Sequence, residues 1–161
     1  MSRNKEKFVN TDIARRVGSG NEVLYVYSFP SQVKEMYRCK SGNEQPINVK
    51  VGMSTVASAK QRIAKQLGTS NNENAILLLE YRCNDARHAE SYVHQVLIKS
   101  GSKINSPGRE WFSAKISDVV KIVYEYDNKH GNLNSVIGEN THSIWTYVFM
   151  AITFFYMIYG S

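Results

Sequence analysis

The sequence predicts an α+β fold: a small, central, three-stranded antiparallel sheet flanked by helices, followed by a hydrophobic C-terminal helix. Three observations predict this fold. Stretches rich in β-branched and aromatic residues occur at 23–29, 47–53 and 75–81, as is typical of strands. Stretches with apolar residues at helical spacing follow the second and third of them. An uncharged apolar run lies at 144–159.

Length and charge allow one domain with short appendages. The chain has 161 residues and a net charge of +6, and no charged residue follows Glu139. This balance suits an anionic partner but does not by itself select nucleic acid. Cys39 and Cys83 form no CxxC pair, so a zinc finger or redox motif is excluded. The polar, basic start lacks the apolar run of a signal peptide, and we expect a reducing compartment.

Residues 1–21 are predicted to form a basic, flexible arm. Arg and Lys are frequent in it, and Gly18 and Gly20 lie near its end. Such an arm is either a solvated tail or an electrostatic contact for nucleic acid or anionic lipid.

The first strand, 23–29, ends at Pro30 and places Tyr25, Tyr27 and Phe29 on one face. The polar residues 31–46 are predicted to form a long, exposed hairpin loop. The second strand follows at 47–53, with Lys50 and Gly52 sharing a face.

Apolar residues at helical spacing predict a helix over 56–67, capped by Ser54 or Thr55. The apolar run 75–81 is short enough for a buried central strand. Further helices are predicted over 86–99, capped by Asn84 or Asp85, and over 115–127. We therefore expect a folded domain over 22–128 and a linker over 129–142.

The run at 144–159 has no polar face, so packing on one side of a domain explains it poorly. With its uncharged flanks it would span about 28 Å as a helix, close to the ~30 Å of a hydrocarbon core. Aromatic residues lie near both of its ends, as they do at membrane interfaces. We predict a single-pass, C-terminal membrane anchor over 143–160, with the preceding domain in the cytoplasm. The alternative is a helix packed on the domain or in an oligomer.

Short motifs occur in order along these predicted elements. The two strands carry Leu24-Tyr25 and Lys50-Val51-Gly52. The two helices that follow carry Arg62 and then Glu90 with His94, and Glu110-Trp111-Phe112 comes after them. The set resembles the GIY-YIG endonuclease superfamily, in particular its phage open-reading-frame branch. The resemblance covers about residues 22–125 and suggests a virus or mobile element as the source.

The resemblance implies metal-dependent hydrolysis of phosphodiester bonds, in DNA more than in RNA, with Mg²⁺ (or Mn²⁺). Tyr25 matches the first motif tyrosine, Arg62 the helix arginine, and Glu90 the metal-binding glutamate. Lys50 replaces the second motif tyrosine. The late asparagine of the family has no certain counterpart, and Glu110-Trp111-Phe112 occupies its region.

The chemistry of hydrolysis gives each residue type a role. Arg62 can clamp a phosphate as a planar fork. Tyr25 can orient or deprotonate water, and Lys50 can act as a base or as a second phosphate cation. His94, one turn after Glu90, can relay a proton or orient that carboxylate. The predicted catalytic residues are Tyr25, Lys50, Arg62, Glu90 and His94, with Glu90 as the metal ligand, and the predicted substrate-binding residues are Tyr27, Gly52 and Ser54.

Each of these residues could instead have a structural role. Tyr25 and Tyr27 could be half-buried strand residues, and Lys50 and Arg62 solvated charges. Glu90 could form a surface ion pair, and Trp111 and Phe112 could belong to the core or to a lid. Zinc is disfavoured because no third ligand lies at metal spacing. Two other functions stay open, namely a nucleic-acid-binding module that does not cut and a membrane-anchored domain that binds a protein. The oligomeric state is not predicted.

Overall fold

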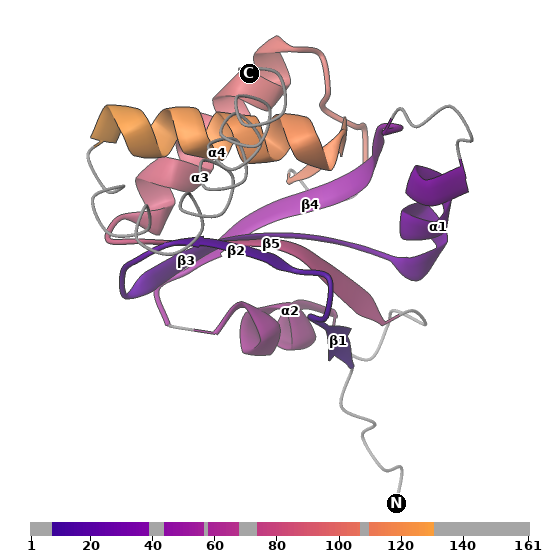
Figure 1. The fold of residues 1–161 in the computed structure, drawn as a ribbon, viewed down its shortest axis with the longest axis horizontal. Coiled ribbons are helices and arrows are strands. Elements are labelled where there is room, and N and C mark those ends of the chain that lie inside the picture. Colours follow the sequence, from indigo (N-terminus) through magenta and orange to yellow (C-terminus); the bar gives the residue numbers. More distant parts are fainter. Residues whose placement is uncertain (1–7, 39–43, 57, 68–73, 107–109, 131–161) are drawn as a thin grey trace, which may run out of the picture.

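The computed structural model describes residues 8–38, 44–56, 58–67, 74–106 and 110–130. Its elements in chain order are β1 (Val9–Asn10), β2 (Arg15–Gly18), β3 (Glu22–Ser28), α1 (Pro30–Arg38), β4 (Ile47–Ser54), α2 (Ala59–Leu67), β5 (Ala75–Cys83), α3 (Ala86–Lys99), β6 (Trp111–Ala114) and α4 (Ile116–His130). Figure 1 shows α3 and α4 on one side of the sheet and α2 on the other. The predicted α+β class is therefore confirmed.

The described part of the chain forms one mixed sheet of six strands, so the prediction of three strands was wrong in number. The order is β1-β5-β3-β4-β6, with β2 also paired to β5. The three predicted strands form the antiparallel centre, in which β3 lies between β4 and β5. β6 extends this centre antiparallel to β4, and β1 and β2 extend it parallel to β5.

Residues 9–10 and 15–18 form strands of the sheet, although residues 1–21 were predicted to form a flexible arm. Val9 of β1 is buried, and Arg16 of β2 pairs with Glu80 of β5 at 4.0 Å. Gly18 has a φ of +75°, and a Cβ there would lie 2.3 Å from the carbonyl oxygen of Arg82. The glycine thus lets the chain run close against β5. The remainder of the arm, 1–7, lies outside the described residues.

The hairpin loop predicted for 31–46 was also wrong, because its first part is the helix α1. Pro30 occupies the first helical position, where a missing N–H costs no hydrogen bond. Val33 is buried and Met36 packs against the same core. Two apolar residues in a polar segment give a weak sequence signal, so packing stabilises this helix more than its composition does.

The other helices agree with the prediction apart from their ends. α2 begins at Ala59 and not at 56, because the Ser58 hydroxyl accepts a hydrogen bond from the backbone N–H of Gln61. Asp85 caps α3 as predicted, accepting from the N–H of His88 at 2.9 Å. α4 runs to His130, so the first two residues of the predicted linker are helical.

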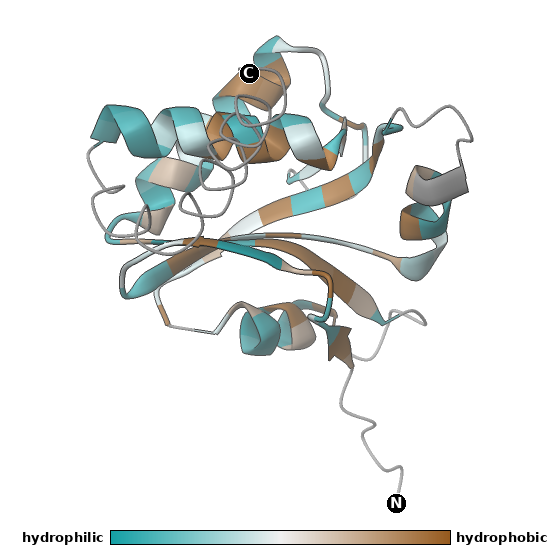
Figure 2. Ribbon diagram, in the orientation of Figure 1, coloured by the Kyte–Doolittle hydropathy of each residue, from teal (hydrophilic) through white to brown (hydrophobic). Residues whose placement is uncertain are grey.

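The sheet separates two apolar cores. Hydropathy alternates along β4 (Figure 2), whose apolar residues Ile47, Val49 and Val51 all belong to the larger core. Leu24, Val26 and the apolar faces of α3 and α4 form the larger core. Tyr25 and Tyr27 face the other way and pack with the apolar face of α2. Both tyrosines are fully buried, so the sheet itself holds them rigidly between strands.

No helix among the described residues is long and apolar enough to cross a membrane. The predicted anchor over 143–160 and the linker residues 131–142 lie outside those residues. Cys39 lies outside them as well. Cys83 is a buried free thiol, and burial raises its pKa to about 11, which suits a structural role.

Candidate functional site

Tyr25 lies at the middle of β3, opposite Gly52 of β4 and Glu80 of β5. Its side chain is fully buried, yet its hydroxyl makes no hydrogen bond within the described part of the chain. Burial raises the pKa of this hydroxyl, and the nearby Arg62 guanidinium opposes the rise. Such a hydroxyl stays protonated at neutral pH and can still form a hydrogen bond.

Gly52 creates the space for that hydroxyl. A Cβ at position 52 would lie 2.7 Å from the Tyr25 hydroxyl oxygen and 2.8 Å from Cζ. These distances are shorter than real Cβ contacts, so only glycine lets the tyrosine lie against the β4 backbone. Gly52 was predicted to bind substrate, and the structure shows that the Tyr25 ring lies close against it.

Lys50 shares the face of Tyr25, since it lies opposite Tyr27 of β3 and Trp111 of β6. Its ammonium group forms an ion pair with the Glu110 carboxylate at 3.2 Å. The carbonyl oxygen of Glu110 also accepts a hydrogen bond from the N–H of Val51 at 3.1 Å. Glu110, undecided from the sequence, is therefore held at the edge of β4 by backbone and side chain together.

Glu90 and His94 come from α3, on the other side of the sheet. His94 Nε2 lies 3.2 Å from the carbonyl oxygen of Val51 and, because a carbonyl only accepts, donates to it. Burial lowers the pKa of His94, so the imidazole is neutral at pH 7. Burial, and then the charge of Glu110, raises the pKa of Glu90. Glu90 and Glu110 are thus close enough to influence each other.

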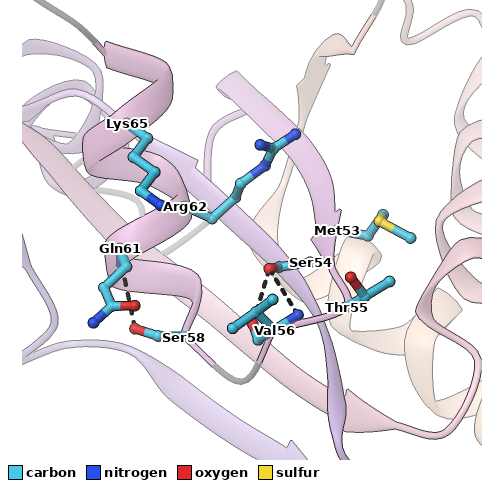
Figure 3. Close-up of a pocket in the computed structure, with 8 residues that line it drawn as sticks. All are labelled: Met53, Ser54, Thr55, Val56, Ser58, Gln61, Arg62 and Lys65. Carbon is cyan, nitrogen blue, oxygen red and sulfur yellow. Dashed lines mark hydrogen bonds between the residues drawn. The ribbon is translucent and has the colours of Figure 1, made fainter.

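Arg62 lies on α2, beside a cleft of about 280 Å³. Figure 3 shows its guanidinium extending away from the helix, with Lys65 on the next turn. The Ser54 hydroxyl fixes the turn at the cleft's edge by donating to the carbonyl oxygen of Val56 and accepting from its N–H. The cleft is lined by Met53, Ser54, Thr55, Val56, Ser58, Gln61, Arg62 and Lys65.

The structure gathers the predicted residues around one segment of β4, residues 50–54. Arg62 and Tyr25 approach from the α2 side, while Glu90 and His94 approach from the α3 side. Lys65 was not among the predicted site residues, although it follows Arg62 by three residues and so shares its helix face. Glu110 was identified from the sequence only as part of the Glu110-Trp111-Phe112 motif, because its ion pair with Lys50 depends on the pairing of β4 with β6.

The donor set suits magnesium better than zinc. No group of three His, Cys, Asp or Glu side chains in the described residues is arranged to hold a metal ion. Mg²⁺ needs only one or two carboxylates, because waters and substrate phosphates complete its shell. Zinc sites take three or four protein ligands. Glu90 and Glu110, two carboxylates within electrostatic range of each other, fit the first pattern.

A family model described as the T5orf172 domain matches residues 22–127. This domain is phage-associated and related to the GIY-YIG and HNH-like nuclease folds. Neither the curated proteins nor the solved structures gave a match. The matched segment contains every candidate site residue described above.

Proposed function

Since the chain belongs to the T5orf172 domain family, we propose that it is a GIY-YIG-type endonuclease that hydrolyses phosphodiester bonds in DNA with Mg²⁺ or Mn²⁺. The family is compatible with a nuclease or DNA-binding role. The observation that supports the finer proposal is that the groups of the candidate site are close enough to influence one another. The charges of Lys50 and Arg62 act on the Glu90 carboxylate, and Arg62 also acts on the Tyr25 hydroxyl, which packs against Gly52. A hydroxyl, two cations and a carboxylate are the groups that phosphodiester hydrolysis requires.

Arg62 and Lys50 bind the scissile phosphate in this proposal. Arg62 reaches it from α2 as a planar fork that can bind two oxygens. Lys50 exchanges part of its ion pair with Glu110 for a phosphate oxygen. Lys50 is more effective here than in open water, because its side chain is only 17% exposed, whereas Arg62 is exposed beside the cleft.

Tyr25 orients the attacking water. Its hydroxyl is buried, is without a hydrogen-bond partner among the described residues, and has a raised pKa. These properties support a neutral donor and acceptor more than a tyrosinate base. Of the two roles considered from the sequence, orientation of water is therefore the better supported.

Glu90, with Glu110 beside it, would hold the divalent cation. When bound, Mg²⁺ supplies a Lewis acid for the phosphate oxygens and lowers the pKa of a bound water. His94 donates to the carbonyl oxygen of Val51 and so holds α3 against β4. We propose that it positions Glu90 through this contact, and its role as a proton relay remains a prediction.

The proposal has three further parts: a membrane anchor over 143–160, which lies outside the described residues, placement of the domain in the cytoplasm, and a viral or mobile element as the source.

A nicking assay tests the proposed activity. The full chain, purified in mild detergent, should convert supercoiled plasmid to open circles when Mg²⁺ or Mn²⁺ is present. We expect Glu90→Gln and Arg62→Gln to reduce the rate at least 100-fold. Glu125→Gln, an exposed carboxylate on α4, serves as the matched control and should keep the wild-type rate. Equal activity of Glu90→Gln and wild type would refute the site.

A binding module without cleavage is the second candidate. It is favoured by Lys50, which replaces a tyrosine of the family motif. Salt-dependent DNA binding by the wild type with no nicking under any divalent cation would select it.

A further inference from the structure

Three aromatic rings gather at one end of the sheet face that carries Tyr25. Phe29 and Trp111 stack with centroids 5.6 Å apart and planes 24° apart. Tyr27 meets both of them edge to face, at 6.1 and 5.8 Å. Tyr27 is buried, whereas Phe29 and Trp111 are half-buried. We call Phe29 and Trp111, resting on Tyr27, the aromatic shelf.

The aromatic shelf adjoins the candidate site. Lys50 lies directly between Tyr27 and Trp111 in the register of β3, β4 and β6. Directly opposed residues have Cβ atoms about 5 Å apart, so the Lys50 side chain begins between these rings. Its ammonium pairs at 3.2 Å with the carboxylate of Glu110, the residue before Trp111. Gly52 follows two residues later on the same face, about 7 Å along the strand. A nucleotide chain that crosses this end of β4 therefore meets the shelf beside the phosphate that Lys50 and Arg62 are proposed to bind.

The two rings of the shelf are only partly covered. Phe29 and Trp111 pack against the apolar core that contains Tyr27, and both keep part of their surface in solvent. An aromatic surface bordered by a cation is the arrangement by which proteins hold single-stranded nucleic acid, with the cation on phosphate and the ring on a base. A base inside a duplex is covered by neighbouring bases on both faces, so it cannot also stack on a side chain.

We infer that the aromatic shelf stacks an unpaired base next to the scissile phosphate. The inference rests on the proposed function and names its substrate class: DNA with a single-stranded segment at the cleavage point, such as an overhang, flap or junction, in preference to continuous duplex.

Binding of defined oligonucleotides tests this inference without cleavage, in EDTA. Two DNA hairpins of equal charge serve as probes, one blunt and one with an unpaired overhang. The chain has two tryptophans, so Trp145→Phe leaves Trp111 as the only one. We expect the overhang to quench Trp111 fluorescence and the blunt hairpin to leave it nearly unchanged.

Substitutions give the second readout. Stacking of one base is worth about 1–3 kcal/mol, so Trp111→Leu should weaken overhang binding by roughly 5- to 150-fold and blunt binding by less than twofold. Trp111→Phe keeps a ring and should restore most of the affinity. Phe8→Leu is the matched control, because Phe8 is an exposed aromatic beside a cation, Lys60, away from the site.

The outcomes separate the two proposals. Equal losses on both hairpins, or no fluorescence difference between them, overturn the shelf. If Trp111→Leu does not fold, the fluorescence comparison in the Trp145→Phe chain decides alone. A preference for the overhang in a protein that never nicks DNA supports the shelf and refutes the nuclease.

Discussion

Substituting Gly52 by alanine tests the packing at the centre of the candidate site. In a strand with ordinary φ, this change normally stabilises a protein by about 0.4–1 kcal/mol, because alanine has less freedom in the unfolded chain. Here the new Cβ would lie 2.7 Å from the Tyr25 hydroxyl oxygen, 2.8 Å from Cζ and 2.9 Å from Cε2. All three atoms belong to a ring with no exposed surface. The ring cannot turn aside, so the strand or the tyrosine must shift.

Overpacking of this kind costs about 1–3 kcal/mol. After subtraction of the ordinary gain, we expect Gly52→Ala to lower the free energy of unfolding by about 1–2 kcal/mol. At a typical urea m-value this lowers the unfolding midpoint by about 1 M. Urea titration followed by circular dichroism measures it. A midpoint equal to or above that of the wild type would refute the geometry, since the sign alone distinguishes a clash from open space.

The same variant links packing to activity. If the Tyr25 hydroxyl orients water, displacing it should lower the nicking rate far more than the loss of folded protein does. We expect at least a 30-fold loss, about 2 kcal/mol of transition-state stabilisation, under conditions where the variant is fully folded. A folded Gly52→Ala protein with wild-type activity would remove Tyr25 from the mechanism.

Three other changes have outcomes that follow from the structure. Because the pKa of Glu90 is raised, Mn²⁺ affinity should fall as the pH drops through a window above 4.5. Glu110→Gln removes a like charge and should move that fall in affinity to lower pH. Titration calorimetry at several pH values measures both effects. Lys65→Gln should reduce the slope of log K against log salt by about 0.9 if Lys65 neutralises one duplex phosphate, as filter binding would measure. Tyr81→Phe removes the 2.7 Å hydrogen bond to the buried Asp127 and should cost about 2 kcal/mol in urea unfolding, with DNA binding unchanged.

Much of the central fold could be predicted because its signals are local. The strand over 75–81 is a continuous apolar run, and Asp85 caps α3 with the hydrogen bond expected of its residue type. β2 could not be predicted this way, since a four-residue strand containing two arginines has no strand pattern. It exists because β5 offers an edge with which it pairs in parallel. α1 was missed for a related reason, since Val33 and Met36 are the apolar residues described in the core from an otherwise mostly polar segment.

The candidate site shows the same division between local and tertiary signals. Arg62 and Glu90 could be identified because each lies in a recognisable helix at an ordered position along the chain. Glu110 could be assigned a place only after β6 was paired with β4, because its neighbours Lys50 and Val51 lie about sixty positions away. Sequence reasoning finds residues that carry chemistry, whereas strand pairing decides which of them meet.

The position of the site follows from where β6 begins. Groups on α2 and groups on α3 lie on opposite faces of the sheet, so they can meet only around an edge. β6 pairs with β4 from Ile47 to Lys50. Beyond Lys50, Glu110 still accepts from Val51, and no described strand continues along that side of β4. The charges of Arg62 on α2 and Glu90 on α3 nevertheless act on each other, so the groups of the two faces come together where the described pairing of β6 with β4 ends, beside the Lys50–Glu110 ion pair.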